Sequence, residues 1–367
     1  MSKKRILFVR PSLGYGGADR VTVNLLNHFD SDKYEVELAL MHSNGEMQSM
    51  LDRPIKIHDL KVGWLGFAVN PLMKLIRSNN YDVLYSTCGG MSIPMMIAAK
   101  RTNFRGLKVV SERNSLHRTY SSIVKKKSLL SFKKRYYKQA DLVTVVSREI
   151  GSEVQEVLGV NESQIRVVNN PLIGDSFFSE MQEEASFPSI ETGTFNILAI
   201  GRFVKQKDYG TMLKAFNALY TNNKNVRLNI LGKGPLQKDI EDLVDILGIT
   251  NVVSFLGFDS NPFKYLRIAD AFILSSLHEG MPGVLVQAMA AGLPVISTDC
   301  PTGPNEIIDN NKNGILIPVS DISAAHLALE SLLHNPEKSM EMGKKAALSI
   351  ERYSINNGVD SYFKILD

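Results

Sequence analysis

A loop followed by a short helix, between Ser275 and Ala291, carries the side chains best suited to holding a sugar and its phosphates. An apolar run ends at Ser275, a loop with two glycines and a proline follows, and a helix is predicted from about Val284. Backbone N–H groups near Gly283 would lie at the start of that helix, where they can receive a phosphate. Glu279, in the loop, offers a carboxylate that can accept hydrogen bonds from sugar hydroxyls.

Two cations follow another apolar run in the same way. In the segment GRFVKQKD, directly after NILAI, Arg202 and Lys207 come before a helix that begins near Tyr209. A guanidinium and an ammonium at the end of a strand can clamp a diphosphate, since arginine supplies a fork of donors and lysine a point charge. The alternative is a solvated cationic loop without a ligand. Gln287 lies one turn into the helix after Glu279, from where it could reach a ribose.

A glycine-rich loop lies between the run RILFV and a predicted helix. Its Gly16 and Gly17 could bring backbone amides to a phosphate, or they could form a tight turn without a ligand. The dinucleotide pattern G-x-G-x-x-G fails here because its sixth residue is Asp19, and it fails again at Gly232, where the sixth residue is a glutamine. No G-x-x-x-x-G-K-[ST] occurs. NAD-dependent enzymes and P-loop ATPases are therefore disfavoured.

Short apolar runs alternate with helical patterns along the whole chain. Runs such as ILFV, NILAI and AFIL are continuously apolar, which is typical of strands in a parallel sheet covered on both faces. Alternation of this kind predicts an α/β chain with doubly wound, Rossmann-like domains. The predicted strands are Arg5–Val9, Glu35–Met41, Ile55–Leu60, Asp82–Tyr85, Leu107–Val110, Leu142–Val146, Arg166–Val168, Asn196–Ile200, Arg227–Leu231, Val252–Leu256, Ala271–Leu274, Pro294–Ser297 and Ile315–Ile317. Helices are predicted around Val21, Leu25 and Phe29 and over Pro94–Lys100.

The length of 367 residues favours two domains. Residues 173–194 show little periodicity and are interpreted as a linker between residues 1–172 and residues 195–350. Residues 351–367 are predicted to form a C-terminal helix that packs back on the N-terminal domain. Two such domains would face each other across a cleft, with ligands beyond the carboxyl ends of the strands.

The basic residues are concentrated in one segment. Lys100–Lys138 holds 13 Lys and Arg residues against one acid, whereas the whole chain has a net charge of +4. This asymmetry suggests an anionic partner, and the segment Arg113–Lys138 could lie on an anionic membrane surface; a solvated helix face is the alternative. One face of that helix is predicted to carry Tyr120, Ile123, Val124, Leu130 and Tyr137, with Lys125–Lys127 and Lys133–Arg135 beside it.

Several classes of protein and site are disfavoured by composition and motifs. The first apolar run is too short for a signal peptide, no run approaches a membrane span, and Cys88 and Cys300 are isolated, so we expect a cytoplasmic protein. The only D-x-D match, Asp30 to Asp32, follows a helix and precedes a strand, so a turn is expected rather than a metal site. No nucleophile elbow and no RNA-binding aromatic motif occurs, so neither a hydrolase nor nucleic-acid binding is expected.

Taken together and in this order, the motifs resemble those of the retaining glycosyltransferases of family 4, which have the GT-B fold. GGADR resembles that family's GGAER loop, GRFVKQKD its G-R-x-x-x-x-K segment, and LGKGP its G-x-G-P turn. The segment from Glu279 to Gln287 resembles its E-x7-E region, and STDCPTGPNEII the segment after it. The sequence looks most similar to bacterial enzymes that build O-antigen, capsule or protein-linked glycans on a lipid carrier, several of which transfer N-acetylgalactosamine.

The resemblance implies a role for each matching position. Arg202 and Lys207 would hold the donor diphosphate, and Glu279 the hydroxyls of the transferred sugar. Gln287 would bind the ribose, although the family usually has a glutamate there. Where many relatives carry a histidine facing the acceptor, this chain reads ERNS, so Asn114 or His117 could take that place. Further donor contacts would come from Gly16, Gly17, Gly232, Phe258, Gly280, Met281, Pro282, Gly283 and Val284.

The resemblance also implies the reaction. A hexosyltransferase would move a hexose or N-acetylhexosamine from a UDP-sugar to a polyprenyl-diphosphate-linked saccharide, with retention of configuration and without a metal ion or cofactor. It would act on the inner face of the cytoplasmic membrane as a peripheral protein. Two rivals stay open: a sugar-nucleotide 2-epimerase of the same fold, which would need acid and base carboxylates, and a non-catalytic nucleotide-sugar-binding protein.

Overall fold

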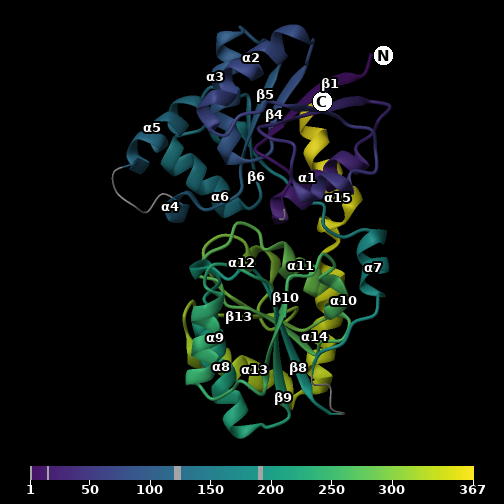
Figure 1. Cartoon of the computed structure of the whole chain (residues 1–367), viewed down its shortest axis with the longest axis vertical. Coiled ribbons are helices and arrows are strands. Elements are labelled where there is room, and N and C mark those ends of the chain that lie inside the picture. Colours follow the sequence, from purple (N-terminus) through teal and green to yellow (C-terminus); the bar gives the residue numbers. More distant parts are fainter. Residues whose placement is uncertain (1, 15, 120–124, 189–192) are drawn as a thin grey trace. The chain divides into compact units, whose positions relative to one another are not determined.

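The computed structural model describes residues 2–14, 16–119, 125–188 and 193–367, and the chain divides into two compact units (Figure 1). Unit 1 comprises residues 1–171 together with Ile355–Asp367, and unit 2 comprises Leu172–Ser354. Each unit is built on one parallel sheet, so the chain has the two Rossmann-like domains predicted. Among the described residues, no helix is both long and apolar enough to cross a membrane.

Unit 1 contains a seven-stranded sheet in the order β3-β2-β1-β4-β5-β6-β7. In the central strand β1, Ile6, Leu7 and Phe8 are consecutive and fully buried, because helices cover both faces of the sheet. All pairs are parallel, so the loops after β1, β4 and β5 meet at one edge. The strands are β1 Lys4–Arg10, β2 Tyr34–Leu40, β3 Lys56–Asp59, β4 Val83–Ser86, β5 Leu107–Glu112, β6 Leu142–Val145 and β7 Ile165–Val167.

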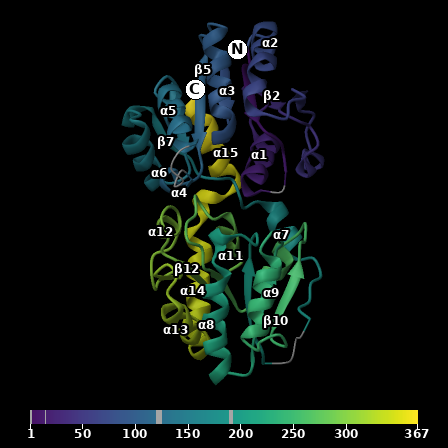
Figure 2. The same cartoon turned by 60° about the vertical axis from the view of Figure 1, so that its left-hand side comes forward.

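The helices of unit 1 include one from the C-terminal end of the chain. Helix α15 lies beside α1 in both views (Figures 1 and 2), and Tyr362 and Phe363 bury their rings against the core of this unit. The longer helices are α1 Gly17–His28, α2 Val69–Ser78, α3 Gly89–Arg101, α5 Lys125–Tyr137 and α15 Ile355–Phe363, with the shorter α4 Leu116–Thr119 and α6 Arg148–Glu153.

Unit 2 contains a six-stranded parallel sheet in the order β10-β9-β8-β11-β12-β13. Its central strands β8 and β11 are apolar on both faces, and their carboxyl ends carry the loops that hold Lys207 and Glu279. The strands are β8 Phe195–Ile200, β9 Val226–Leu231, β10 Val253–Gly257, β11 Ala271–Leu274, β12 Val295–Thr298 and β13 Ile315–Ile317. The helices are α7 Asp175–Met181, α8 Tyr209–Asn222, α9 Gln237–Ile246, α10 Phe263–Leu266, α11 Gly283–Ala290, α12 Pro304–Ile307, α13 Ile322–His334 and α14 Pro336–Ser349.

Two predicted segments differ from the structure, and a third is described only in part. The helix predicted over Pro94–Lys100 begins earlier, at Gly89, and carries Pro94 inside it. The segment expected to be a linker contains α7, whose Phe177 packs on Phe263 with ring centroids 4.9 Å apart, so this part belongs to unit 2. The basic segment contains α4 and α5. Tyr120, Ile123 and Val124 of its predicted face lie outside the described residues.

A buried carboxylate joins three strands of unit 1 and the loop before β4. Glu37 on β2 has a side chain only 3% exposed, and it accepts hydrogen bonds from Arg5, Lys56, His58 and Tyr81. Burial by itself would raise the pKa of this carboxyl group, but the hydrogen bonds from Tyr81, His58 and Lys56 outweigh burial and lower the pKa to about 2.

We therefore expect Glu37→Gln to lower the free energy of unfolding at pH 7 by roughly 2–3 kcal/mol. A carboxyl group with a depressed folded-state pKa stabilises the fold above its ordinary value of 4.5, and this contribution is lost as the pH falls towards 2. Urea unfolding should show the difference between variant and wild type shrinking from pH 7 to pH 3.5. Glu35→Gln, at an exposed position on the same strand, is the control and should change stability by less than about 0.5 kcal/mol. If the free energies of unfolding of Glu37→Gln and wild type differ equally at pH 7 and pH 3.5, the lowered pKa of Glu37 is contradicted.

Candidate functional site

The centre of the candidate site in unit 2 is an ion pair between Lys207 and Glu279. Lys207 Nζ lies 2.6 Å from Glu279 Oε1, and the hydroxyl of Ser276 donates to the same oxygen at 2.6 Å. Glu279 is 8% exposed, so the carboxylate is largely withdrawn from water. Two residues predicted separately from different motifs are therefore in direct contact.

The loop after β8 fixes the position of Lys207. A 3₁₀ turn over Lys205–Lys207 leads to Asp208, whose backbone is left-handed with φ 44° and whose side chain caps α8 by accepting from the Thr211 backbone N–H at 3.4 Å. The hydroxyl of Ser275 donates to the carbonyl of Lys207 at 2.7 Å. Arg202, earlier in the same loop, is exposed.

The loops after β11 and β12 interlock around Glu279. Thr302 donates its hydroxyl to the carbonyl of Glu279, and the Glu279 N–H donates to the Pro301 carbonyl at 3.3 Å. Gly303 has φ 109°, and a Cβ there would lie 2.9 Å from the Gly280 carbonyl oxygen, so this position requires glycine. The interlocked loops hold Glu279 where β11 ends.

Helix α11 begins immediately after this loop. Pro282 is its N-cap residue and makes no side-chain hydrogen bond to the cap, so the amides that follow have no side-chain acceptor there. Gly280 and Pro282 are buried, whereas Met281, Gly283 and Val284 are half-buried. Gln287 is half-buried on the first full turn, and in the described part of the chain its side chain makes no hydrogen bond.

Two of the predicted donor contacts, Gly232 and Phe258, lie at the ends of β9 and β10. Gly232 has φ 153°, and a Cβ there would lie 1.9 Å from the Gly201 carbonyl oxygen, so the β8 and β9 loops approach too closely for any side chain. The ring of Phe258 is 45% exposed, and Lys233 Nζ lies 4.6 Å from its centroid. An exposed aromatic ring of this kind offers a stacking surface.

In the glycine-rich loop of unit 1, a carboxylate of the chain itself lies at the backbone amides. Gly16 is the N-cap of α1, and its N–H donates to Asp19 Oδ2 at 2.9 Å. The other oxygen of Asp19 pairs with Arg10, a guanidinium only 3% exposed. Gly17 is exposed, and no atom lies within 4 Å of the position a Cβ would occupy. Part of the predicted phosphate site is thus filled by a carboxylate of the chain.

The predicted acceptor-side residues lie on the surface of unit 1. Asn114 is exposed, and His117 is exposed with Nε2 3.8 Å from Glu156. Glu153 accepts from the Leu116 backbone N–H at 2.5 Å, at the start of α4, and from the Ser115 hydroxyl at 2.8 Å. Asn114 and His117 are therefore exposed side chains beside a helix start that Glu153 already occupies.

Two cations counted in the basic segment point into the protein, which corrects their assignment to an anionic surface. Arg113 is 9% exposed and donates to Asn170 at 3.3 Å and to the Tyr362 hydroxyl at 2.7 Å. Lys133 is 3% exposed and forms an ion pair with the buried Glu112. Neither charge can bind a membrane while these contacts are kept.

Some side chains around Glu279 were missed by sequence reasoning. Ser276 and Thr302 both hold Glu279, and the only available signal was that each follows an apolar run at the carboxyl edge of the sheet. Cys300 is 1% exposed nearby; burial, together with the negative charge of Glu279, raises the pKa of its thiol to about 12. The thiol is therefore neutral at pH 7 and unsuited to act as a nucleophile. In the described parts of the chain, no three His, Cys, Asp or Glu side chains converge as metal ligands.

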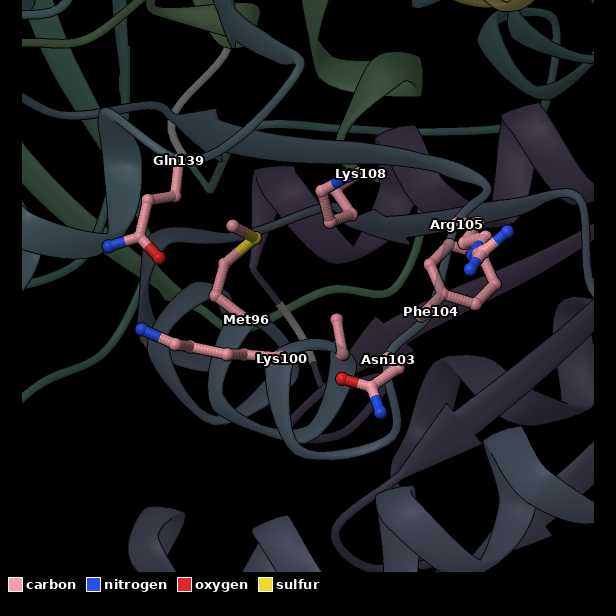
Figure 3. Close-up of a pocket in the computed structure, with 8 residues that line it drawn as sticks. Met96, Lys100, Asn103, Phe104, Arg105, Lys108 and Gln139 are labelled. Atoms are coloured by element: carbon pink, nitrogen blue, oxygen red, sulfur yellow. The ribbon is translucent and has the colours of Figure 1, made fainter.

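A separate pocket of about 460 Å³ lies in unit 1 where α3 ends and β5 begins (Figure 3). Its walls include Met96, Lys100, Arg105 and Lys108, and Lys108 Nζ is already paired with Asp141 at 2.6 Å. Because it lies at the amino end of β5, it is on the opposite edge of the sheet from the glycine-rich loop and Asn114.

Comparisons with known proteins agree with the motifs. Residues 15–172 match the family model described as Glycosyltransferase Family 4, and residues 181–349 match the model described as Glycosyl transferases group 1. Among curated relatives, the N-acetylgalactosamine-N,N'-diacetylbacillosaminyl-diphospho-undecaprenol 4-alpha-N-acetylgalactosaminyltransferase of Campylobacter jejuni is 26% identical over 91% of this chain and 92% of its own length. An uncharacterized glycosyltransferase of Methanocaldococcus jannaschii is 32% identical over 53% of this chain, which spans about half (49%) of that protein. The crystal structure of Anabaena HepE in complex with UDP and glucose superposes with a TM-score of 0.81 at 19% identity, covering 98% of each chain.

Proposed function

Because the chain belongs to the GT-B glycosyltransferases of group 1 and family 4, we propose that it transfers a sugar from a UDP-sugar to a lipid-linked saccharide, with retention of configuration and without a metal ion. The observation that carries the proposal is the Lys207–Glu279 pair, held by Ser276 at the carboxyl edge of the unit 2 sheet. In open parallel sheets this edge is where ligands bind. The pair presents one cation and one carboxylate to a ligand that is itself part phosphate and part sugar.

The donor would bind across the loops of unit 2. Lys207 and the exposed Arg202 would neutralise the diphosphate, and the amides at the start of α11 would add hydrogen bonds. Glu279 would accept from hydroxyls of the transferred sugar, Gln287 would bind the ribose, and Gly232 and Phe258 would border the base. The Anabaena neighbour that contains UDP and glucose supports UDP as the nucleotide.

In the proposed retaining transfer, each bond that breaks is matched by one that forms. The bond between the anomeric carbon and the phosphate oxygen breaks, the acceptor oxygen bonds to that carbon on the same face, and the proton of the acceptor hydroxyl passes to the leaving diphosphate. Charge grows on the diphosphate as this bond breaks, and fixed positive charge is then most effective. We therefore expect Lys207 to contribute more to the rate of transfer than any other side chain of the site. No side chain is assigned as a nucleophile.

The acceptor would be a polyprenyl-diphosphate-linked saccharide. The name of the Campylobacter relative, which covers nearly the whole chain, supports both this acceptor and N-acetylgalactosamine as the transferred sugar. Asn114 and His117 would face the acceptor from unit 1. A peripheral position on the inner face of the cytoplasmic membrane follows from an acceptor of this kind.

The experiment that tests this function supplies each UDP-sugar with an undecaprenyl-diphosphate-linked saccharide and follows the product by mass spectrometry and NMR. Addition of one sugar in an α linkage, unchanged in excess EDTA, is the expected result. Parallel reactions with the UDP-sugar alone separate the rivals: formation of an epimer would identify a 2-epimerase. Tight UDP-sugar binding with no turnover on any acceptor would identify a binding protein.

A further inference from the structure

An exposed aromatic turn in unit 1 has no role in the proposed site. The segment GWLGF, residues 63–67, leads from β3 into α2, and Trp64 is 76% and Phe67 72% exposed. Large aromatic side chains normally bury 150–250 Å² each, so two on one turn form a substantial exposed apolar surface. Single exposed apolar residues need no explanation, but an adjacent pair of aromatic rings does.

Hydrogen bonds hold the backbone of the turn in place, so the exposure of the Trp64 and Phe67 side chains results from the way this segment folds. The N–H of Val62 donates to the Met41 carbonyl at 2.9 Å, and the N–H of Phe67 donates to the Trp64 carbonyl at 3.0 Å. Gly63 and Gly66 flank Trp64 and Leu65 and have no atom within 4 Å of a built Cβ, so the turn has open space around it. The two rings therefore project from a fixed base.

A second exposed apolar pair lies across the start of α3. Leu65 Cδ2 lies 3.9 Å from a Cβ built on Gly90, and Lys133 Nζ of α5 lies 3.3 Å from a Cβ built on Gly89. The turn and α5 therefore flank the same end of α3. On α5, Leu129 is 47% and Phe132 53% exposed. Apolar side chains thus project on both sides of one helix end in unit 1.

The sequence around the turn is rich in cations. Residues 60–140 contain 16 Lys and Arg residues and two acids, within a chain whose net charge is +4. Part of this charge lies elsewhere, because Arg113 and Lys133 are buried and Lys100, Arg105 and Lys108 line the pocket at the amino end of β5. Lys61, next to the turn, and Lys134 and Arg135 on α5 are exposed.

We propose that the 63–67 turn is a membrane anchor, which places Trp64 and Phe67 in the interface of an anionic bilayer while nearby cations bind the lipid headgroups. Tryptophan favours the membrane–water interface because its ring is apolar and its N–H can stay hydrated. Basic residues beside it gain from the negative potential of the leaflet, and that gain is screened by salt. The role of this anchor rests on the proposed function, because a lipid-linked acceptor lies at the membrane surface. Vesicle binding itself can be measured without any transfer activity.

Trp64 is the only tryptophan in the chain and therefore reports on its own environment. Its emission should shift to shorter wavelength on mixing with vesicles of phosphatidylcholine and phosphatidylglycerol, and lipids brominated in the upper acyl chain should quench it. Vesicles of phosphatidylcholine alone, or high salt, should weaken both effects. Protein that pellets with anionic vesicles while the emission of Trp64 stays unchanged would overturn the proposal.

Phe67→Gln tests the second ring while keeping the fluorescent probe. Vesicle binding should weaken roughly tenfold, as expected when a mostly exposed aromatic ring loses its apolar burial. Leu348→Gln, at an 82% exposed position on α14 in unit 2, is the matched control and should bind as wild type does. Equal binding by Phe67→Gln and wild type would also overturn the anchor. Transfer to a short-chain, water-soluble acceptor does not need a membrane and should be the same in all three proteins. If the wild type does not catalyse this transfer at all, the proposed function is contradicted, but the membrane anchor is not.

Discussion

Replacing Lys207 by alanine should lower kcat/KM for transfer by about 10²–10³-fold. This is the effect of removing one preorganised group that stabilises charge developing in a transition state. Lys207 Nζ is 2.6 Å from Glu279 and its side chain is only 15% exposed, so water is a poor substitute for the ammonium group at this site. Its three N–H donors allow it to keep the bond to Glu279 and still reach a phosphate.

Lys205→Ala supplies the control for this measurement. Lys205 begins the same 3₁₀ turn but is exposed, so its loss should change kcat/KM less than threefold. Removing Lys207 also leaves the Glu279 carboxylate without its cation, and a fall in Tm should accompany the loss of activity. Activity of Lys207→Ala within threefold of wild type would remove this lysine from the diphosphate site.

Glu279→Gln should lower kcat by roughly 10–150-fold while the protein stays folded. Glutamine keeps an oxygen for Lys207 and Ser276, but hydrogen bonds from sugar hydroxyls to a charged acceptor, worth about 1.5–3 kcal/mol, are lost. Steady-state kinetics with varied donor would separate this effect from binding of the nucleotide.

Gln287→Ala is the comparison variant for Glu279→Gln. In the proposed function Gln287 binds the ribose, which does not change during the reaction, so the donor KM should rise with little change in kcat. A fall in kcat for Gln287→Ala as large as that for Glu279→Gln would contradict the division between ribose and sugar. So would a Glu279→Gln variant whose kcat equals that of wild type.

The inner strands were predictable from the sequence because they are buried on both faces. Strands such as β8 and β11 are largely apolar, as expected where helices cover both faces of a parallel sheet. The edge strands β3 and β7 overlap predicted strands too, but they read KIHD and IRV and are partly exposed. The start of α3 was missed because Gly89 and Gly90 are poor helix formers, and Pro94 resembles a first-turn residue although it lies in the interior.

Contacts between residues distant in sequence were not predictable. Lys133 belongs to a run of basic residues typical of a solvated face, and nothing local indicates that it turns inward to Glu112, 21 positions earlier. The hydroxyl of Thr302 reaches the Glu279 carbonyl only because two loops at neighbouring strands interlock. Motifs identified Lys207 and Glu279 individually, and only the fold showed that they form one pair.

The carboxylate of Asp19 at the start of α1 has a consequence for which anions can bind there. It is tethered three residues from Gly16, so its effective concentration at that amide far exceeds that of a dissolved monovalent anion. Chloride, acetate and other weakly charged species should therefore be outcompeted by the resident group. The charge of Arg10 is not available in its place, because this guanidinium is 3% exposed and already donates to Asp19, Thr22 and Thr87. We therefore expect an anion that binds this loop to displace the carboxylate of Asp19 from the Gly16 amide.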